Sequence, residues 1–129
     1  MKPVPATAVV ALQLEIGYAM KIPNADRAVI DAGKLVDYLL NPEHRRGGSK
    51  AALLISFGYS SAAWQQLEEA LRRDHLSQDV FRVRQSAYGT RYEIRAHLST
   101  PIGQPLMLRS VWQVDTGTDV PRFITAYPD

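Results

Sequence analysis

Hydrophobic and polar residues alternate with a period of two through most of the second half of the chain. The alternation runs through residues 81–84, 92–98, 106–114 and 123–127. It predicts strands whose side chains point alternately to the two faces of a sheet. Short connections that contain Gly89, Gly103 or Gly117 separate these segments, and links of this length join antiparallel neighbours. The pattern therefore predicts a four-stranded antiparallel sheet.

Helical spacing dominates the first half. Residues 31–40, 50–57 and 61–74 place apolar side chains three and four positions apart, which is typical of helices that bury one face. A capping side chain stands at the start of each segment: Asp31, Ser49, and Ser60 or Ser61. Helices followed by strands, without alternation of the two, predict an α+β fold with the helices packed on one face of the sheet.

The length of 129 residues fits a single domain, which we expect over residues 21–129. Residues 1–20 form an N-terminal arm or an added strand in this interpretation, because residues 8–16 are rich in β-forming side chains. The sheet would then have five strands. The apolar run over residues 6–14 is too short to span a bilayer, so we expect no membrane association.

The chain contains no cysteine, which excludes disulfides, thiolate zinc sites and cysteine nucleophiles. This composition is compatible with the reducing cytoplasm, which is the predicted location. The three histidines are not spaced to share a metal on one helix, and the sequence has no carboxylate cluster. We therefore expect neither a metal nor another cofactor.

The predicted sheet has two unlike faces. Six hydrophobic residues would pack on the helices: Phe81, Val83, Ile94, Leu98, Leu108 and Trp112. The opposite face would display Arg82, Arg84, Arg95, His97 and Arg109. Arginine suits phosphate, so these four arginines are candidate RNA-binding residues. A solvated face that Glu93 and Gln113 interrupt explains the same pattern equally well.

The basic loop over residues 44–50 precedes the second predicted helix. Lys50 lies at the start of that helix, where the partial positive charge of the helix end disfavours a cation. Glycines, a serine and a lysine at a helix start can form an anion site. His44, in the same loop, is the best candidate for a general acid or base. Taken alone, however, these residues favour the simpler interpretation of a soluble turn.

The last predicted strand carries three polar residues, Arg122, Thr125 and Tyr127. Thr125 and Tyr127 would share a face of the sheet because they are two positions apart. The alternative is an ordinary edge strand that ends at Pro128.

Several of these segments resemble a small bacterial family of domains of unknown function. The matching segments lie within residues 20–128 and include Ile22-Pro23-Asn24-Ala25, Lys34-Leu35, Tyr38-Leu39-Leu40, Gly48-Ser49-Lys50-Ala51, Val111-Trp112 and Pro121-Arg122-Phe123-Ile124-Thr125-Ala126-Tyr127-Pro128. The helix-then-sheet order and the closing strand also resemble the barnase–EndoU–colicin–RelE group of ribonuclease toxins.

This second resemblance implies a metal-independent endoribonuclease of the bacterial toxin type, in which the RNA 2′-hydroxyl attacks the adjacent phosphate. The implied roles are an acid or base for His44, stabilisation of the pentacovalent phosphate for Lys50, Arg109 and Arg122, and its orientation for Thr125 and Tyr127. A cognate antitoxin or immunity protein would be the partner.

Two other classes of function remain open. The first is a non-enzymatic interaction module, such as an antitoxin, an immunity protein or a phage-associated accessory domain, which would need a docking patch. The second is a nucleic-acid binder without catalysis, which would stack bases on sheet aromatics. If the enzyme interpretation holds, Lys50, Arg122 and at least one of His44 and Tyr127 should line one cleft. In either case Trp64 and Trp112 should be largely buried between helices and sheet.

Overall fold

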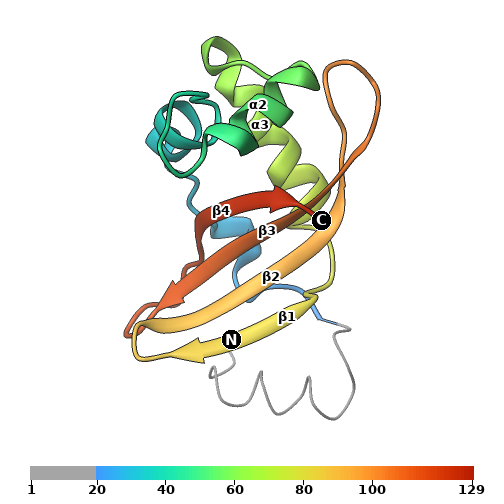
Figure 1. Ribbon diagram of the computed structural model, residues 1–129. Coiled ribbons are helices and arrows are strands. Elements are labelled where there is room, and N and C mark those ends of the chain that lie inside the picture. The colour runs from blue at the N-terminus through green and yellow to red at the C-terminus, as the bar shows by residue number, and fades with distance from the viewer. Residues whose placement is uncertain (1–19) are drawn as a thin grey trace.

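The computed structural model describes residues 20–129 and has an α+β fold. Its sheet contains four antiparallel strands in sequence order, β1 (Arg82–Ser86), β2 (Gly89–Leu98), β3 (Leu106–Asp115) and β4 (Arg122–Pro128) (Figure 1). The predicted fold class and the four predicted strands are thus confirmed. The candidate strand over residues 8–16 lies outside the described residues, as does all of the predicted arm except Met20.

The helical half contains short segments rather than three regular helices. In chain order they are η1 (Ala25–Arg27), η2 (Lys34–Leu39), α2 (Gly48–Ser56), η3 (Ser61–Ala63), α3 (Trp64–Ala70) and η4 (Leu71–His75). Both η2 and η4 are wound as π-helix. The helical segments gather beside β4 and on one face of the sheet (Figure 1).

Two of the three predicted caps are confirmed. The Asp31 carboxylate accepts a hydrogen bond from the Gly33 amide at 2.9 Å, just before the turns that lead into η2. The Ser60 hydroxyl accepts one from the Ala63 amide at 3.3 Å. The prediction for Ser49 is wrong, because α2 begins one residue earlier, at Gly48, and no side chain caps it.

One hydrophobic core fills the space between the helices and the sheet. Trp112 is fully buried in it, together with Ile94, Leu98 and Leu108 from the predicted helix-facing set. Trp64 is only partly buried at the margin of this core, so its predicted burial is confirmed in part. The strand faces are therefore oriented as the alternation predicts.

Phe81 is the exception among the residues predicted to face the helices. The centroid of its ring lies 4.7 Å from the guanidinium carbon of Arg109 and 5.6 Å from that of Arg95, on the opposite face. The paired part of β1 begins only at Arg82, so Phe81 precedes the ladder and does not follow its alternation.

Candidate functional site

A β-bulge in β4 determines which of its side chains share a face. Two consecutive residues of β3 pair with Thr125 and Phe123, so Ile124 is the extra residue of the bulge. Without it, a spacing of three would place Arg122 and Thr125 on opposite faces of the strand. The extra residue reverses that relation. Arg122, Thr125 and Tyr127 therefore all lie on the face that also carries the arginines.

Lys50 reaches from α2 to this face and brings three elements together. Its ammonium group donates a hydrogen bond to the Tyr38 hydroxyl at 2.7 Å and one to the Thr125 hydroxyl at 3.3 Å. The same nitrogen lies 5.2 Å from the ring centroid of Tyr38 and 5.9 Å from that of Tyr127. Within residues 20–129, Lys50 forms no ion pair with a carboxylate. We call Lys50, Tyr38, Thr125 and Tyr127 the Lys50 cluster.

The partners of Lys50 suit an anion. In the described part of the chain, four arginines of the sheet form ion pairs with carboxylates: Arg84, Arg95, Arg109 and Arg122 pair with Glu93, Asp115 or Asp129. Lys50 instead contacts only neutral hydroxyls and ring faces. A cation that is partly withdrawn from water keeps its full attraction for a negative ligand when no carboxylate compensates it. The arrangement is therefore suited to a phosphate group.

Tyr38 is the residue of this cluster that the sequence analysis missed. Burial raises the pKa of its phenol, but the hydrogen bonds from Lys50 and Thr125 and the positive charges of Lys50 and Lys34 outweigh burial and lower the pKa below 10. The Tyr38 and Thr125 hydroxyls are 3.0 Å apart. Nothing in the helical spacing marks Tyr38, because both of its partners come from later parts of the chain.

The two glycines where α2 begins, Gly47 and Gly48, allow the loop to pack on Tyr38. A Cβ atom added at Gly47 would lie 2.6 Å from a carbon of the Tyr38 ring, and one added at Gly48 would lie 2.5 Å from the carbonyl oxygen of Pro42. Contacts this short are not tolerated. The sequence suggested that these glycines cradle an anion, whereas the structure gives them a packing role.

His44 organises the same loop. Its Nδ1 accepts hydrogen bonds from the amides of Arg46 and Gly47, both at 3.1 Å, and its ring meets that of Tyr38 edge-on at 4.9 Å. The neutral ring must then carry its hydrogen on Nε2. Protonation of Nδ1 would break both hydrogen bonds. This geometry favours a positioning role for His44 over the predicted role as acid or base.

The arginines predicted to bind RNA form an ion-pair network instead of an open row. Arg109 donates to Glu93 at 3.2 Å and to Asp129 at 3.0 Å, and Arg95 pairs with Asp129. Arg84 lies 3.6 Å from Glu93, whose side chain is only 8% exposed. Three guanidinium groups thus share two carboxylates, which leaves little net charge for a phosphate. Arg82 forms no ion pair within the described part of the chain.

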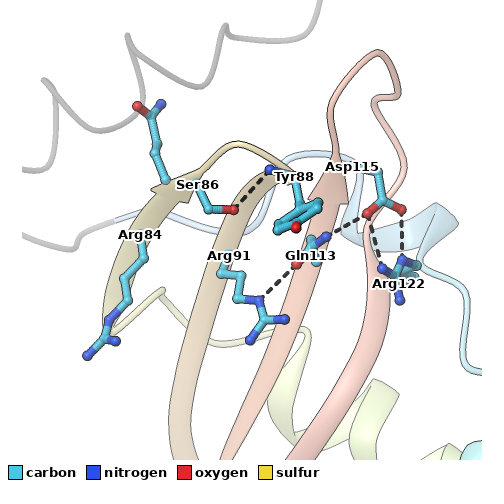
Figure 2. Close-up of a pocket in the computed structure, with 8 residues that line it drawn as sticks. Arg84, Ser86, Tyr88, Arg91, Gln113, Asp115 and Arg122 are labelled. Carbon is cyan, nitrogen blue, oxygen red and sulfur yellow. Dashed lines mark hydrogen bonds and ion pairs between the residues drawn. The ribbon is translucent and has the colours of Figure 1, made fainter.

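Arg122 lies apart from the Lys50 cluster. It pairs with Asp115 through two hydrogen bonds of 2.7 and 3.1 Å, at the end of the sheet where β4 begins (Figure 2). Thr125 lies three positions further along the strand, a distance of roughly 10 Å. The structure therefore brings Lys50, Thr125 and Tyr127 together, with His44 against Tyr38, and gives Arg122 different neighbours.

Residues 20–129 contain neither a cluster that could bind a metal nor a helix that could span a membrane. No group of three or more histidine, aspartate or glutamate side chains in this range is arranged to hold a metal ion. No helix in the same range is long and apolar enough to cross a membrane.

The family of the chain follows from its sequence as a whole. Residues 21–129 match the model of a domain of unknown function, DUF6883. The chain belongs to this family. No curated protein matches it.

A solved structure shares its fold. One chain of a complex described as "Contact-dependent growth inhibition toxin - immunity protein complex from Klebsiella pneumoniae 342" superposes with a TM-score of 0.63 at 22% sequence identity. The match covers 82% of the present chain and 97% of that chain. At this identity the likeness extends to the fold, and the description names both a toxin and its immunity protein.

Proposed function

We propose that this DUF6883 domain is one member of a toxin–immunity pair, and that it is the toxin, an endoribonuclease whose site is the Lys50 cluster. The observation that carries the second half of the proposal is the ammonium group of Lys50, which lies between the hydroxyls of Tyr38 and Thr125 and has no carboxylate partner among residues 20–129. The likeness to one chain of a toxin–immunity complex supports the first half.

The reaction requires a stabilised phosphate and a route for protons. The RNA 2′-oxygen would attack phosphorus, and the bond to the 5′-oxygen would break, to leave a 2′,3′-cyclic phosphate and a 5′-hydroxyl. Lys50 would face the negative charge that grows on the phosphate oxygens. The surroundings of Tyr38 ease loss of its own proton, so its phenolate form would take the proton of the 2′-hydroxyl. Water would supply the proton that the departing 5′-oxygen takes up. Thr125 and Tyr127 would orient the phosphate.

A second candidate is the immunity side of such a pair, without catalysis. One chain of a complex that contains an immunity protein shares the fold. The network of Arg109, Glu93 and Asp129 combines charges of both signs rather than positive charge alone. Alternating charges of this kind suit a protein partner with complementary groups. This candidate predicts that expression protects a cell, whereas the toxin predicts that expression slows its growth.

The experiment is RNA cleavage by the purified protein in excess EDTA. We expect fragments that end in 2′,3′-cyclic phosphate, and no cleavage where a 2′-deoxy nucleotide replaces the reacting one. Lys50→Ala and Tyr38→Phe should each lower the cleavage rate about a hundredfold or more. Lys21→Ala is the matched control, because Lys21 is exposed and paired with Asp79 away from the cluster, and it should cleave like the wild type.

Melting temperatures of the same proteins separate loss of the site from loss of the fold. Lys21→Ala is a surface substitution and should change stability by about 0.5 kcal/mol or less. Lys50 and Tyr38 are partly buried and hydrogen-bonded, so their variants should lose about 1–3 kcal/mol but still unfold in a single cooperative transition. If the wild type cleaves no RNA and does not slow growth, the ribonuclease proposal is wrong. Protection of cells against a toxin encoded beside this chain would then favour the immunity candidate.

A further inference from the structure

A polar hollow of about 510 Å³ lies at the end of the sheet opposite the β2–β3 turn. Its walls come from all four strands and from the β1–β2 turn: Arg84, Gln85, Ser86, Tyr88, Arg91, Gln113, Asp115 and Arg122 (Figure 2). Three of these side chains are guanidinium groups and one is a carboxylate. Arg84 is shared with Glu93 and Arg122 is paired with Asp115, so the net positive charge of the hollow comes from Arg91.

A chain of hydrogen bonds fixes two of these guanidinium groups. The Arg91 Nε donates to the Gln113 side-chain oxygen at 2.8 Å, the Gln113 amide donates to Asp115 at 2.6 Å, and Asp115 accepts both bonds from Arg122 (Figure 2). Gln113 is 3% exposed, so the chain is anchored in the sheet. Among the described residues, Arg91 is held by the Gln113 amide and pairs with no carboxylate. Its outer N–H groups and its full charge remain available to a ligand.

Tyr88 stands over this hollow from the β1–β2 turn, and 77% of it is exposed. Two hydrogen bonds hold the backbone of Tyr88 in this turn. The Ser86 hydroxyl accepts from the Tyr88 amide at 3.2 Å, and the Tyr88 carbonyl accepts from the Thr116 amide at 2.9 Å. A large ring is thus held in water beside positive groups. This is the arrangement by which proteins stack the bases of a single strand.

We propose that this hollow binds a nucleotide of single-stranded RNA next to the one that is cleaved. Tyr88 would stack on the base, and Arg91 and Arg84 would contact the phosphate. The proposal rests on the proposed ribonuclease function. The bulge in β4 places Arg122, on the β4 wall of the hollow, and Thr125 of the Lys50 cluster on one face, roughly 10 Å apart along the strand. A protein interface is less suited to it, since the hollow offers Tyr88 as its one apolar anchor among charged groups.

The test measures binding without cleavage. The probe is a fluorescein-labelled 2′-O-methyl RNA oligonucleotide, which has no free 2′-hydroxyl to attack, and its affinity is followed by fluorescence anisotropy. Tyr88→Ala should weaken binding about tenfold or more, as loss of base stacking does, whereas Tyr88→Phe keeps the ring and should bind like the wild type. Arg91→Ala should weaken binding and reduce its salt dependence by about one ion contact.

Matched controls come from the far end of the sheet and from the helical half. Ile102→Ala removes another exposed side chain of a strand turn, and Arg73→Ala removes an exposed arginine that is paired with Asp74. Both should bind the probe like the wild type. If Tyr88→Ala and Arg91→Ala also bind like the wild type, or if the wild type does not bind the probe, the nucleotide site is refuted.

These outcomes are independent of the cleavage assay. Cleavage by the wild type with no effect of Tyr88→Ala on affinity would refute the nucleotide site and leave the ribonuclease proposal intact. Weaker binding by Tyr88→Ala without any cleavage by the wild type would support the site and refute the ribonuclease. An effect of Tyr88→Ala confined to capture of a protein partner would refute the nucleotide site and assign the hollow to a protein interface.

Discussion

Acidification should destabilise this fold through one buried histidine. His75, at the end of η4, is 0% exposed, and its Nδ1 lies 2.7 Å from the Ser110 hydroxyl. Ser110 also accepts a hydrogen bond of 2.8 Å from the indole nitrogen of Trp112. Position at a helix end favours a charged histidine. Here, however, the imidazole sits in the hydrophobic core, where a charge is costly.

Burial lowers the pKa of His75 from 6.5 to about 4, although the backbone of Ala96 and the carboxylate of Asp74 act in the opposite direction. In the unfolded chain the His75 imidazole is therefore protonated as the pH falls through 6.5, whereas in the folded chain it is protonated only near pH 4. Stability from this group is complete above pH 6.5 and is lost as the pH falls. At 1.36 kcal/mol for each unit of pKa difference, the loss is about 2 kcal/mol between pH 7.5 and pH 5 and about 3 kcal/mol by pH 4.

Urea unfolding at several values between pH 7.5 and pH 5 measures this loss directly. The window lies above the range in which Asp74 and Asp115 titrate, since the pKa of each carboxyl is already below 3.8. His75→Gln should flatten the dependence on pH, even though it lowers stability at neutral pH. His97→Gln removes an exposed histidine and should leave the dependence unchanged.

A wild-type stability that stays constant from pH 7.5 to pH 5 would refute this role of His75. Loss of the pH dependence in His97→Gln, and not in His75→Gln, would refute it as well. A typical domain has a free energy of unfolding of about 5–15 kcal/mol. A decrease of about 2 kcal/mol is a large part of this value, so urea unfolding can measure it.

Two further predictions concern the core and a turn. Trp112→Ala should lower the free energy of unfolding by about 3–5 kcal/mol. Trp64→Ala should lower it by less, because Trp64 is only partly buried. Equal losses for the two variants in urea unfolding would contradict this difference in burial. Gly89→Ala should prevent proper pairing of β2 with β3, because its φ is 143° and the added Cβ would lie 2.1 Å from the carbonyl oxygen of Val114. Gly103→Ala, with a φ of 82° and open space around the Cβ position, should cost only about 1–2 kcal/mol; thermal unfolding that ranks the two glycines in the opposite order would refute this.

Local patterns were sufficient for the elements of the fold and for part of the site. Period-two alternation predicted all four strands, and the capping roles of Asp31 and Ser60 followed from residue type alone. Lys50 was singled out because a cation at a helix start needs an explanation. Thr125 and Tyr127 were paired by their spacing of two. These inferences held because each depends on residues that are neighbours in the sequence.

Local patterns did not predict the contacts between residues that are far apart in the sequence. Phe81 was placed on the wrong face because alternation cannot tell where a ladder begins. Arg109 and Arg84 were read as free cations because Glu93 was counted as an interruption of their row and not as their partner. Tyr38 went unnoticed because its partners, Lys50 and Thr125, are 12 and 87 positions away along the chain.

The sequence by itself determined the α+β class, the four strands, the family and the unusual lysine before the second helix. Only the tertiary structure decided what surrounds that lysine. Because of the bulge at Ile124, Arg122 and Thr125 lie on the same face of the sheet. Arg122 is nevertheless at the other end of β4, where it pairs with Asp115 and not with the Lys50 cluster. The physical reason is that periodicity fixes the direction of a side chain along its own element, whereas its charge partners depend on which elements pack together.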